Sequence, residues 1–513
     1  MFIVSNIIML IGVSLNSIFI IFTLFFERKS PSRRLTWLLL LFFLPYVGMI
    51  LYILFSGHFF TRTRSMTKIT KELSQIYLPL LKEEKKILKE SSSKLPNNQI
   101  KKYNKIITMN MKNANSFLSF TETVAIFTFG EHMYDALCND IENATESIFM
   151  EFFIWRNDKT GKRILDLLCK KAQQGVKVKL IFDDLGSFFT PRNFFTPLKK
   201  AGGEVLPFFN LKRGVAFSVN FRNHRKISII DGKIVYTGGM NIGDEYANCS
   251  SKRKWKNVTV RDTHIRITGS SVLALQTVFL IDWFSITERK NIKKDIKNIS
   301  KYFPIDTFER YSKIISTDSE KKLIHELLTE TQIPTQIVTS GPDNIQKAEI
   351  RDMLIRMILS AKKSVRIQTP YFTPDDTFLS VLKIAANSGI NVEIIVPGKW
   401  DKWYVREAAF DFIRECLDSD IKFFAYDGFI HSKMCIVDGH VVTIGTTNID
   451  TRSFDLHFEV NAVFYDQIIA KQCDDIFDED KKNATALCSE DFNKHFILRR
   501  ALWGFCRLFS PLM

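Results

Sequence analysis

The chain has 513 residues, a formal net charge of +16, and a composition that is 46% hydrophobic and 25% charged. This length predicts roughly three folding units of about 150 residues, and the composition excludes collagen-like, disordered and disulfide-scaffold proteins. The positive charge indicates an anionic partner, either a nucleic acid or an acidic membrane surface.

Two apolar runs open the chain, over residues 2–26 and 35–57, and neither contains a charged side chain. Each exceeds the about 20 helical residues that cross the hydrocarbon layer of a bilayer. A removable signal peptide would have a basic start and a shorter apolar centre. We therefore predict a two-helix transmembrane anchor over residues 1–60, with a pair of buried core helices as the less favoured alternative.

The side of the membrane on which the soluble part lies is predicted less directly. Basic residues lie both between the two runs and after the second, so the positive-inside rule does not decide the orientation. The eight cysteines form no C-x-x-C pair and no zinc-ligand spacing, which is typical of free thiols in a reducing compartment. We expect a cell-membrane protein with two spans whose soluble part lies on the cytoplasmic side.

A polar and basic stretch follows the second apolar run, over residues 61–110. It contains the chain breakers Ser-Ser-Ser at 91–93 and Pro-Asn-Asn at 96–98. We predict a basic connector that passes from helical to flexible structure.

Strand and helix patterns alternate from residue 111 onward. Residues 147–155 and 176–182 are rich in aromatic and branched side chains, as strands are, and a helical pattern separates them. The same order recurs from residue 361. Strands separated by helices predict an α/β fold of two duplicated lobes, 111–325 and 326–513, each a mixed sheet flanked by helices.

Two of the nine histidines begin the pattern His-x-Lys-x(4)-Asp. The residues of the two copies are His224, Lys226 and Asp231, and His431, Lys433 and Asp438. Each residue of the second copy stands 207 positions after its counterpart, and a glycine and an asparagine after each motif keep this shift. A register kept without a gap indicates an internal duplication.

The residue types of the motif suit phosphate chemistry. A histidine and a lysine two apart on an apolar strand would leave the same face. A neutral imidazole can act as a nucleophile or a proton carrier near neutral pH, and the ammonium group offers a positive charge to a phosphate oxygen. The candidates for further phosphate contacts are the amides and small residues after the motifs, namely Asn241, Asn448, Gly239 and Thr446.

Two facing copies of the motif would surround one phosphorus atom. One histidine would form a covalent phosphohistidine, and the other would protonate the leaving alcohol and deprotonate the incoming one. The lysines and asparagines would stabilise the charge without a metal ion or a cofactor. The symmetry does not say which histidine is the nucleophile. Asp231 and Asp438 stand before glycines at turns, which favours a structural role over proton transfer.

These motifs resemble the phospholipase D superfamily, and the chain is similar nearly end to end to bacterial cardiolipin synthases. The stretches that carry the narrower similarity are 45–52, 223–226, 241–246, 275–283, 448–453 and 507–512. The similarity is weakest between residues 61 and 105. One departure is Thr446, where serine is usual, and it keeps a hydroxyl group at that position.

The resemblance implies that His224 is the nucleophile and His431 the general acid and base. It also implies that a carboxylate on a following strand orients each histidine, and the candidates are Asp262 for His224 and Glu459 for His431. The implied reaction converts two phosphatidylglycerol molecules into cardiolipin and glycerol. The expected partners are this anionic phospholipid and the membrane, and no nucleic acid.

Several alternatives remain at this point. A phospholipase D-type phosphodiesterase, a nuclease or a phosphatidyltransferase acting on serine would use the same motifs, and a non-catalytic membrane scaffold lies outside the enzymes. The anchor favours a lipid substrate. Residues 496–509 interleave apolar and basic side chains, as either an interfacial helix or a core-packing terminal helix would. Oligomeric state and acyl-chain preference are not predicted.

Overall fold

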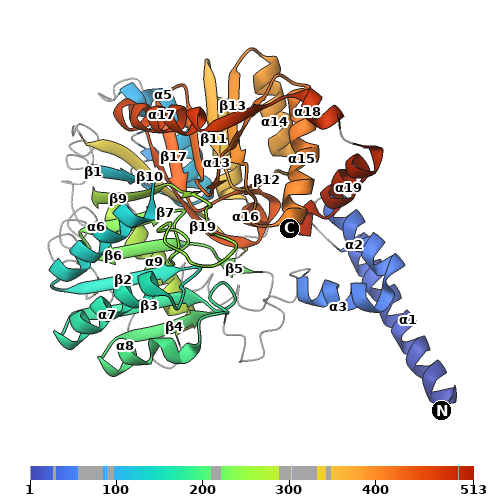
Figure 1. The fold of residues 1–513 in the computed structure, drawn as a ribbon, viewed down its shortest axis with the longest axis horizontal. Coiled ribbons are helices and arrows are strands. Elements are labelled where there is room, and N and C mark those ends of the chain that lie inside the picture. Colours follow the sequence, from blue (N-terminus) through green and yellow to red (C-terminus); the bar gives the residue numbers. More distant parts are fainter. Residues whose placement is uncertain are drawn as a thin grey trace.

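The computed structural model describes residues 2–26, 31–55, 98–209, 221–287, 332–342, 348–494 and 496–512, and the single residues 82, 85, 86, 88 and 302. Most of the expected connector, the expected lobe boundary at 325/326, and His58, His325 and His495 lie outside the described residues. Figure 1 shows a large α/β body with the N-terminal helices beside it.

The first lobe alternates strands and helices as predicted. Its elements in chain order are β1 (Leu118–Phe127), α6 (Gly130–Asn143), β2 (Ser147–Phe152), α7 (Lys159–Gln173), β3 (Lys177–Asp183), η1 (Arg192–Phe195), α8 (Thr196–Lys200), β4 (Glu204–Phe208), β5 (Arg222–Asn223), β6 (Lys226–Ile230), β7 (Ile234–Gly238), β8 (Val260–Arg261), β9 (His264–Gly269) and α9 (Ser271–Ile286).

The second lobe repeats this order and extends it at the C-terminus. Its elements are β10 (Ile333–Ser340), α13 (Glu349–Ile358), β11 (Ser364–Gln368), β12 (Phe372–Thr373), α14 (Asp376–Asn387), β13 (Asn391–Pro397), α15 (Trp403–Leu417), β14 (Lys422–Tyr426), β15 (Phe429–Ile430), β16 (Met434–Val437), β17 (Val441–Gly445), β18 (Ile449–Asp450), α16 (Thr451–Asp455), β19 (His457–Phe464), α17 (Gln467–Lys482), β20 (Ala484–Leu487), α18 (Ser489–Asn493), α19 (Ile497–Leu508) and η5 (Ser510–Leu512).

The lobes share one strand topology. The first runs β1-β9-β7-β6-β2-β3-β4, and the second runs β10-β19-β17-β16-β11-β13-β14. In both, the last three strands are parallel and the other neighbours are antiparallel. The predicted duplication and the mixed strand directions are therefore confirmed.

The two half-sheets are joined, which differs from the expectation of one sheet per lobe. β1 pairs antiparallel with β10, from Leu118 opposite Gln336 to Thr121 opposite Ile333, and the strands form one 16-stranded sheet. The pairing has a physical reason, because β1 and β10 would otherwise be open edges with unpaired backbone groups. A buried apolar cluster spans both lobes across this junction.

The end of the predicted connector is a packed helix. Residues 98–110 belong to α5 (Asn98–Asn113), whose buried residues include Ile100, Tyr103 and Ile107. Its Asn110 Nδ2 donates to Gln336 Oε1 of β10 at 3.0 Å. The apolar residues recur at three- and four-residue intervals, so one face of the helix can pack on the sheet.

The N-terminal apolar runs form three helices, α1 (Phe2–Phe25), α2 (Pro31–Phe43) and α3 (Pro45–Phe55). The predicted second span is thus two helices, because Pro45 lacks a backbone N–H and disfavours helix at the residue before it. Trp37, Leu41 and Tyr52 are buried where the helices pack together. Among the described residues, the helices do not reach the length and apolar character required to cross a bilayer.

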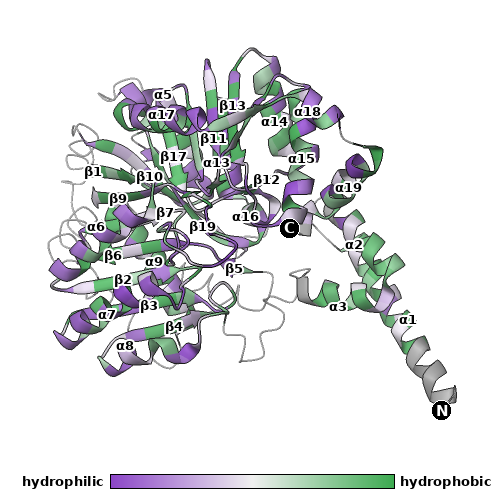
Figure 2. Ribbon diagram, viewed as in Figure 1, coloured by the Kyte–Doolittle hydropathy of each residue, from purple (hydrophilic) through white to green (hydrophobic). Residues whose placement is uncertain are grey.

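The C-terminal helix α19 packs on the second lobe, as the core-packing alternative predicted. Trp503 and Cys506 are buried, and Trp503 Nε1 donates to Glu407 Oε2 of α15 at 2.7 Å. The N-terminal end of the helix exposes Phe496, Ile497 and Leu498 to at least 75%. Figure 2 shows hydrophobic colouring along much of α2, and Thr36 Oγ1 of α2 donates to the carbonyl of Leu508 at 3.1 Å.

Candidate active site

Each motif histidine lies where its chain crosses to the other lobe. The short strand before His224, β5, pairs with β19 of the second lobe, and the strand before His431, β15, pairs with β8 of the first. The backbone N–H of His224 donates to the carbonyl of Phe458 at 2.9 Å, and that of His431 donates to the carbonyl of Arg261 at 2.6 Å. The backbone of one lobe therefore holds the histidine of the other.

The expectation that His and Lys share one continuous strand is wrong. The short crossing strand ends just before each histidine, and β6 or β16 begins two or three residues after it. The ammonium group of Lys226 donates to the carbonyl of His224 at 2.6 Å, and Lys433 makes the equivalent bond to His431. The bend brings each lysine close to its histidine.

The two orienting carboxylates contact the opposite histidines from those expected. His224 Nδ1 lies 3.0 and 3.1 Å from the Glu459 oxygens, and His431 Nδ1 lies 2.6 Å from Asp262 Oδ2. The exchange follows from the crossed strands, since β19 leads to Glu459 beside β5, and β8 leads to Asp262 beside β15. Each half of the site therefore needs both lobes.

Both imidazoles are held neutral at pH 7. Burial lowers the pKa of His224 well below its usual range, and the charges of Lys226, Lys433 and His431 lower it further. Burial and Lys433 lower the pKa of His431 to about 4, against the opposing effect of Asp262. The charge of His431 is among the causes that lower the pKa of His224, so the two imidazoles lie near each other, as the duplication suggested.

The pKa values of both motif lysines are also lowered. Burial lowers the pKa of Lys226 to about 7, although Glu459 opposes the shift, and lowers that of Lys433 to about 8, although Asp262 opposes it. Buried cations favour an anionic ligand, because such a ligand offsets their lost hydration. The pocket therefore suits a phosphodiester.

The asparagines expected to bind phosphate are buried and hydrogen-bonded within the protein. Asn241 Nδ2 donates to Tyr246 Oη at 2.6 Å, and its Oδ1 accepts from the Ile154 N–H at 3.0 Å. Asn448 Nδ2 donates to Asp450 Oδ2 at 3.0 Å. Both amide nitrogens thus have a protein partner, whereas Asn448 Oδ1 has none among the described residues.

The small residues after the motifs, Gly239 and Thr446, lie next to the carboxylates Asp262 and Glu459. A Cβ atom at Gly239 would overlap the Asp262 carboxylate, so the absence of a side chain at this position lets the carboxylate approach. Thr446 acts similarly in the other half, since its carbonyl lies 3.1 Å from His224 Nδ1 and its hydroxyl donates to Glu459. Both residues position a histidine–carboxylate pair.

The motif aspartates lie away from the histidines they follow. Asp231 accepts the backbone N–H groups of Thr145, Glu146 and Ser147 at 2.7–2.8 Å, and Asp438 accepts those of Lys362, Lys363 and Ser364. Partial burial would raise the pKa of the Asp231 carboxyl, but the hydrogen bonds outweigh it and keep the pKa low. Both carboxylates fix the start of a strand.

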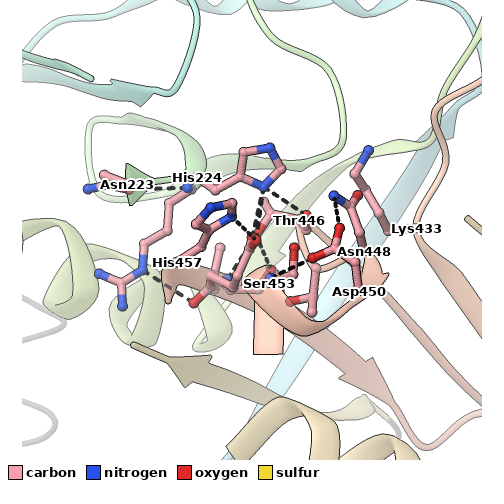
Figure 3. A network of polar contacts seen from close by, with 12 residues as sticks. Asn223, His224, Lys433, Thr446, Asn448, Asp450, Ser453 and His457 are labelled. Carbon is pink, nitrogen blue, oxygen red and sulfur yellow. Dashed lines mark hydrogen bonds and ion pairs between the residues drawn. The ribbon is translucent and has the colours of Figure 1, made fainter. Parts of the chain in front are cut away.

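Four aromatic neighbours of the histidines were not predicted. The Phe153 ring lies 4.9 Å and the His457 ring 5.6 Å from the His224 ring, and the Phe429 and Tyr246 rings lie 5.5 and 5.7 Å from that of His431. Figure 3 shows the His224 and His457 imidazoles side by side. His457 could have been found from its spacing, because it stands two residues before Glu459 on one strand.

Among the described residues, His224, His457 and Glu459 are a group that could hold a metal ion, with their ligand atoms within 4.8 Å of one another. A metal there would compete with the hydrogen bond between His224 and Glu459. It would also lie near the charges of Lys226 and Lys433, which act on His224. The donor set is geometrically suitable, and the surrounding charge favours an anion.

The chain matches known families over most of its length. A family model described as "Cardiolipin synthase, PLD-like domain" matches residues 137–270 and 354–481, and one described as "Phospholipase_D-nuclease N-terminal" matches residues 15–57. A cardiolipin synthase of Staphylococcus aureus strain N315 is 38% identical over 97% of this chain and 95% of its own. Cardiolipin synthase 2 of Staphylococcus epidermidis is 36% identical over 100% and 99%.

The fold also matches a solved structure. Phosphatidylserine synthase of Haemophilus influenzae superposes with a TM-score of 0.58 and 17% identity, over 80% of this chain and 100% of the other. This likeness concerns the fold alone. The two family matches and the full-length relatives lead to one assignment: the chain belongs to the cardiolipin synthases of the phospholipase D superfamily.

Proposed function

We propose that this protein transfers a phosphatidyl group from one phosphatidylglycerol to another, giving cardiolipin and glycerol. The observation that carries the proposal is the pair of crossed contacts, His224 with Glu459 and His431 with Asp262, around two buried lysines. The arrangement offers two neutral imidazoles, each with its Nδ1 bound, to one anionic phosphorus centre. The full-length cardiolipin synthase relatives support the choice of lipid.

The first step begins at His224. Its Nδ1–H donates to Glu459 and to the Thr446 carbonyl, so Nε2 carries the lone pair. The bound phosphodiester raises the pKa of His431, which takes up a proton on Nε2. His224 Nε2 attacks phosphorus, the bond from phosphorus to the glycerol oxygen breaks, and the protonated His431 donates its proton to that oxygen. The products are phosphatidyl-His224 and glycerol.

The second step regenerates the enzyme. His431 accepts the proton of the terminal hydroxyl of a second phosphatidylglycerol, and the resulting oxygen attacks phosphorus. The bond from phosphorus to His224 Nε2 breaks, and cardiolipin forms. An anionic phosphodiester near the lysines raises the pKa of His431, because it offsets the positive charge that lowers it.

Lys226 and Lys433 stabilise the charge on the phosphoryl oxygens in both steps. Each is less than 3% exposed, so its charge acts in a poorly hydrated environment where electrostatic interactions are stronger. Limited access of water also favours transfer to an alcohol over hydrolysis.

The N-terminal helices are proposed as the two-span anchor in the cell membrane, with α1 as one span and α2 with α3 as the second. Large apolar side chains on these helices are exposed, for example Leu10, Phe42 and Ile50 at more than half of their surface. The exposed side of α19 would lie in the interface of the same bilayer.

The exposed thiols Cys249 and Cys488 test the proposed cytoplasmic side. A membrane-impermeant maleimide should label them in inside-out vesicles and leave them unlabelled in sealed right-side-out vesicles. The opposite pattern would place the site on the other side of the membrane. A C249S/C488S variant controls for labelling of the other cysteines.

Purified full-length protein in detergent micelles with phosphatidylglycerol tests the activity. We expect equal amounts of glycerol and cardiolipin, with no divalent metal added. Phosphatidic acid as the main lipid product would indicate a phospholipase, and phosphatidylserine formed only with added serine would indicate a different acceptor. Cleavage of plasmid DNA without lipid turnover would indicate a nuclease.

A further inference from the structure

The two halves of the site differ at one equivalent position. His457 stands two residues before Glu459, and Val260 stands two residues before Asp262. The strand pairings confirm the equivalence, since His457 is opposite Arg222 and Val260 is opposite Phe429, and Phe429 follows Arg222 by the 207-residue shift. At this position the His224 half therefore has a polar side chain next to the carboxylate, and the His431 half has an apolar one.

His457 has an incomplete set of hydrogen bonds. Its side chain is 13% exposed, and within the described part of the chain neither ring nitrogen has a hydrogen-bond partner. Its Nδ1 lies 3.6 Å from Glu459 Oε1, just beyond hydrogen-bond distance. Buried polar atoms normally have hydrogen-bond partners, and a small movement would bring His457 Nδ1 within hydrogen-bond distance of Glu459 Oε1.

The chemistry of His457 makes it a donor. Burial lowers its pKa to about 3, so the imidazole is neutral and carries one N–H group. Glu459 already accepts from His224 Nδ1 and the Thr446 hydroxyl, and an ionised carboxylate has room for a further donor. Hydrogen bonds in a free active site are often long and shorten once a reaction complex forms.

The reaction supplies a reason for this contact to shorten. Bonding of His224 Nε2 to phosphorus makes the ring cationic with a fixed Nδ1–H group, so the ring needs an ionised Glu459 beside it. A second donor to Glu459 stabilises that ionised form. The histidine next to Asp262 is cationic only while it holds the proton that it exchanges, whereas phosphatidyl-His224 stays cationic for the whole lifetime of the intermediate.

We propose that His457 is a positioning residue whose Nδ1–H closes onto Glu459 when phosphatidyl-His224 forms, and that this contact distinguishes the nucleophilic half of the site. The inference rests on the proposed transfer reaction. It gives a structural reason for His224 as nucleophile that the symmetric motifs do not contain.

Three variants of the full-length protein test the contact. His457→Val copies the residue of the other half and removes the donor. In His457→Asn the amide nitrogen replaces Nδ1, whereas in His457→Gln the polar atoms reach the position of Nε2. The measurement is the rate and amount of phosphatidyl-enzyme formed after rapid mixing with radiolabelled phosphatidylglycerol, alongside the melting temperature of each variant.

We expect His457→Val and His457→Gln to slow adduct formation by about 10- to 100-fold, the range for one hydrogen bond to a charged group, while His457→Asn stays within about threefold of the native rate. Equal losses in the Asn and Gln variants, or an unimpaired Val variant, would overturn the proposal. Wild-type protein that forms neither adduct nor cardiolipin would instead overturn the proposed function. A rate loss that only follows the melting temperature would reduce His457 to a packing role.

Discussion

The two lobes are alike in scaffold and unlike around their histidines. Asp231 and Asp438 make the same backbone contacts in both lobes, and the strand order is repeated without change. The carboxylate, by contrast, is Glu459 beside His224 and Asp262 beside His431, and only Glu459 has a histidine two residues before it. The duplicated scaffold is thus nearly symmetric, and the two halves differ in the groups next to their histidines.

Replacement of the two motif histidines gives the largest expected contrast. His224→Asn should abolish turnover and the acid-labile, base-stable phosphoenzyme, because Asn offers no nucleophile. His431→Asn should lower turnover by about 10²- to 10⁴-fold, the usual contribution of a general acid and base, and still form some adduct. The measurement is the amount of radiolabelled lipid that stays bound to the protein after denaturation without acid. If the His224→Asn variant formed the adduct and the His431→Asn variant did not, His431 would be the nucleophile and His224 the general acid and base.

The orienting carboxylates should give the next largest effect. Glu459→Gln and Asp262→Asn each remove the charge that pairs with one imidazole, and we expect losses of about 10²- to 10⁴-fold in kcat. The Glu459 variant should slow adduct formation, and the Asp262 variant should slow proton transfer to the alcohol.

Double variants test which carboxylate acts together with which histidine. On the His431→Asn background, which keeps residual activity, Asp262→Asn should cause no further loss because both changes act on the same imidazole, whereas Glu459→Gln should lower the remaining activity further. If Asp262→Asn lowered the remaining activity and Glu459→Gln did not, the pairing within each lobe that was expected from the sequence would be correct after all.

The lowered pKa values of the two lysines predict that kcat/KM depends on pH. Deprotonation of Lys226 near pH 7 and of Lys433 near pH 8 removes positive charge from the free pocket, so kcat/KM for the anionic lipid should fall as pH rises through this range. The bound phosphodiester raises both pKa values, so the fall in kcat should occur at higher pH. Lys226→Arg stays charged, so its kcat/KM should fall only near pH 8. A kcat/KM that rises above pH 7 would contradict this assignment.

The sequence allowed the duplicated motifs, the lobes and the common pocket to be predicted, because a constant register and strand–helix alternation are local signals. It did not reveal that β5 and β15 cross between lobes, since strands of two residues carry almost no pattern. Asp262 and Glu459 were therefore found as candidates but assigned to the wrong histidines. The sequence also did not reveal that Gly239 leaves room for the Asp262 carboxylate, because that carboxylate comes from a different strand.

The motif aspartates give the smallest expected effect and test the symmetric part of the comparison. Asp231→Asn and Asp438→Asn each replace a charged acceptor of three backbone N–H groups by a neutral one. We expect each to lower the free energy of unfolding by about 1–3 kcal/mol, and the melting temperature by about 1 °C per kcal/mol.

Because neither carboxylate contacts a histidine, the specific activity of the folded protein should stay within about threefold of the native value in both variants. The two melting temperatures should fall by similar amounts, since the contacts are equivalent. A loss of activity without a loss of stability, in one variant only, would show that a motif aspartate takes part in the reaction. It would also show that the halves differ in their scaffold as well as around their histidines.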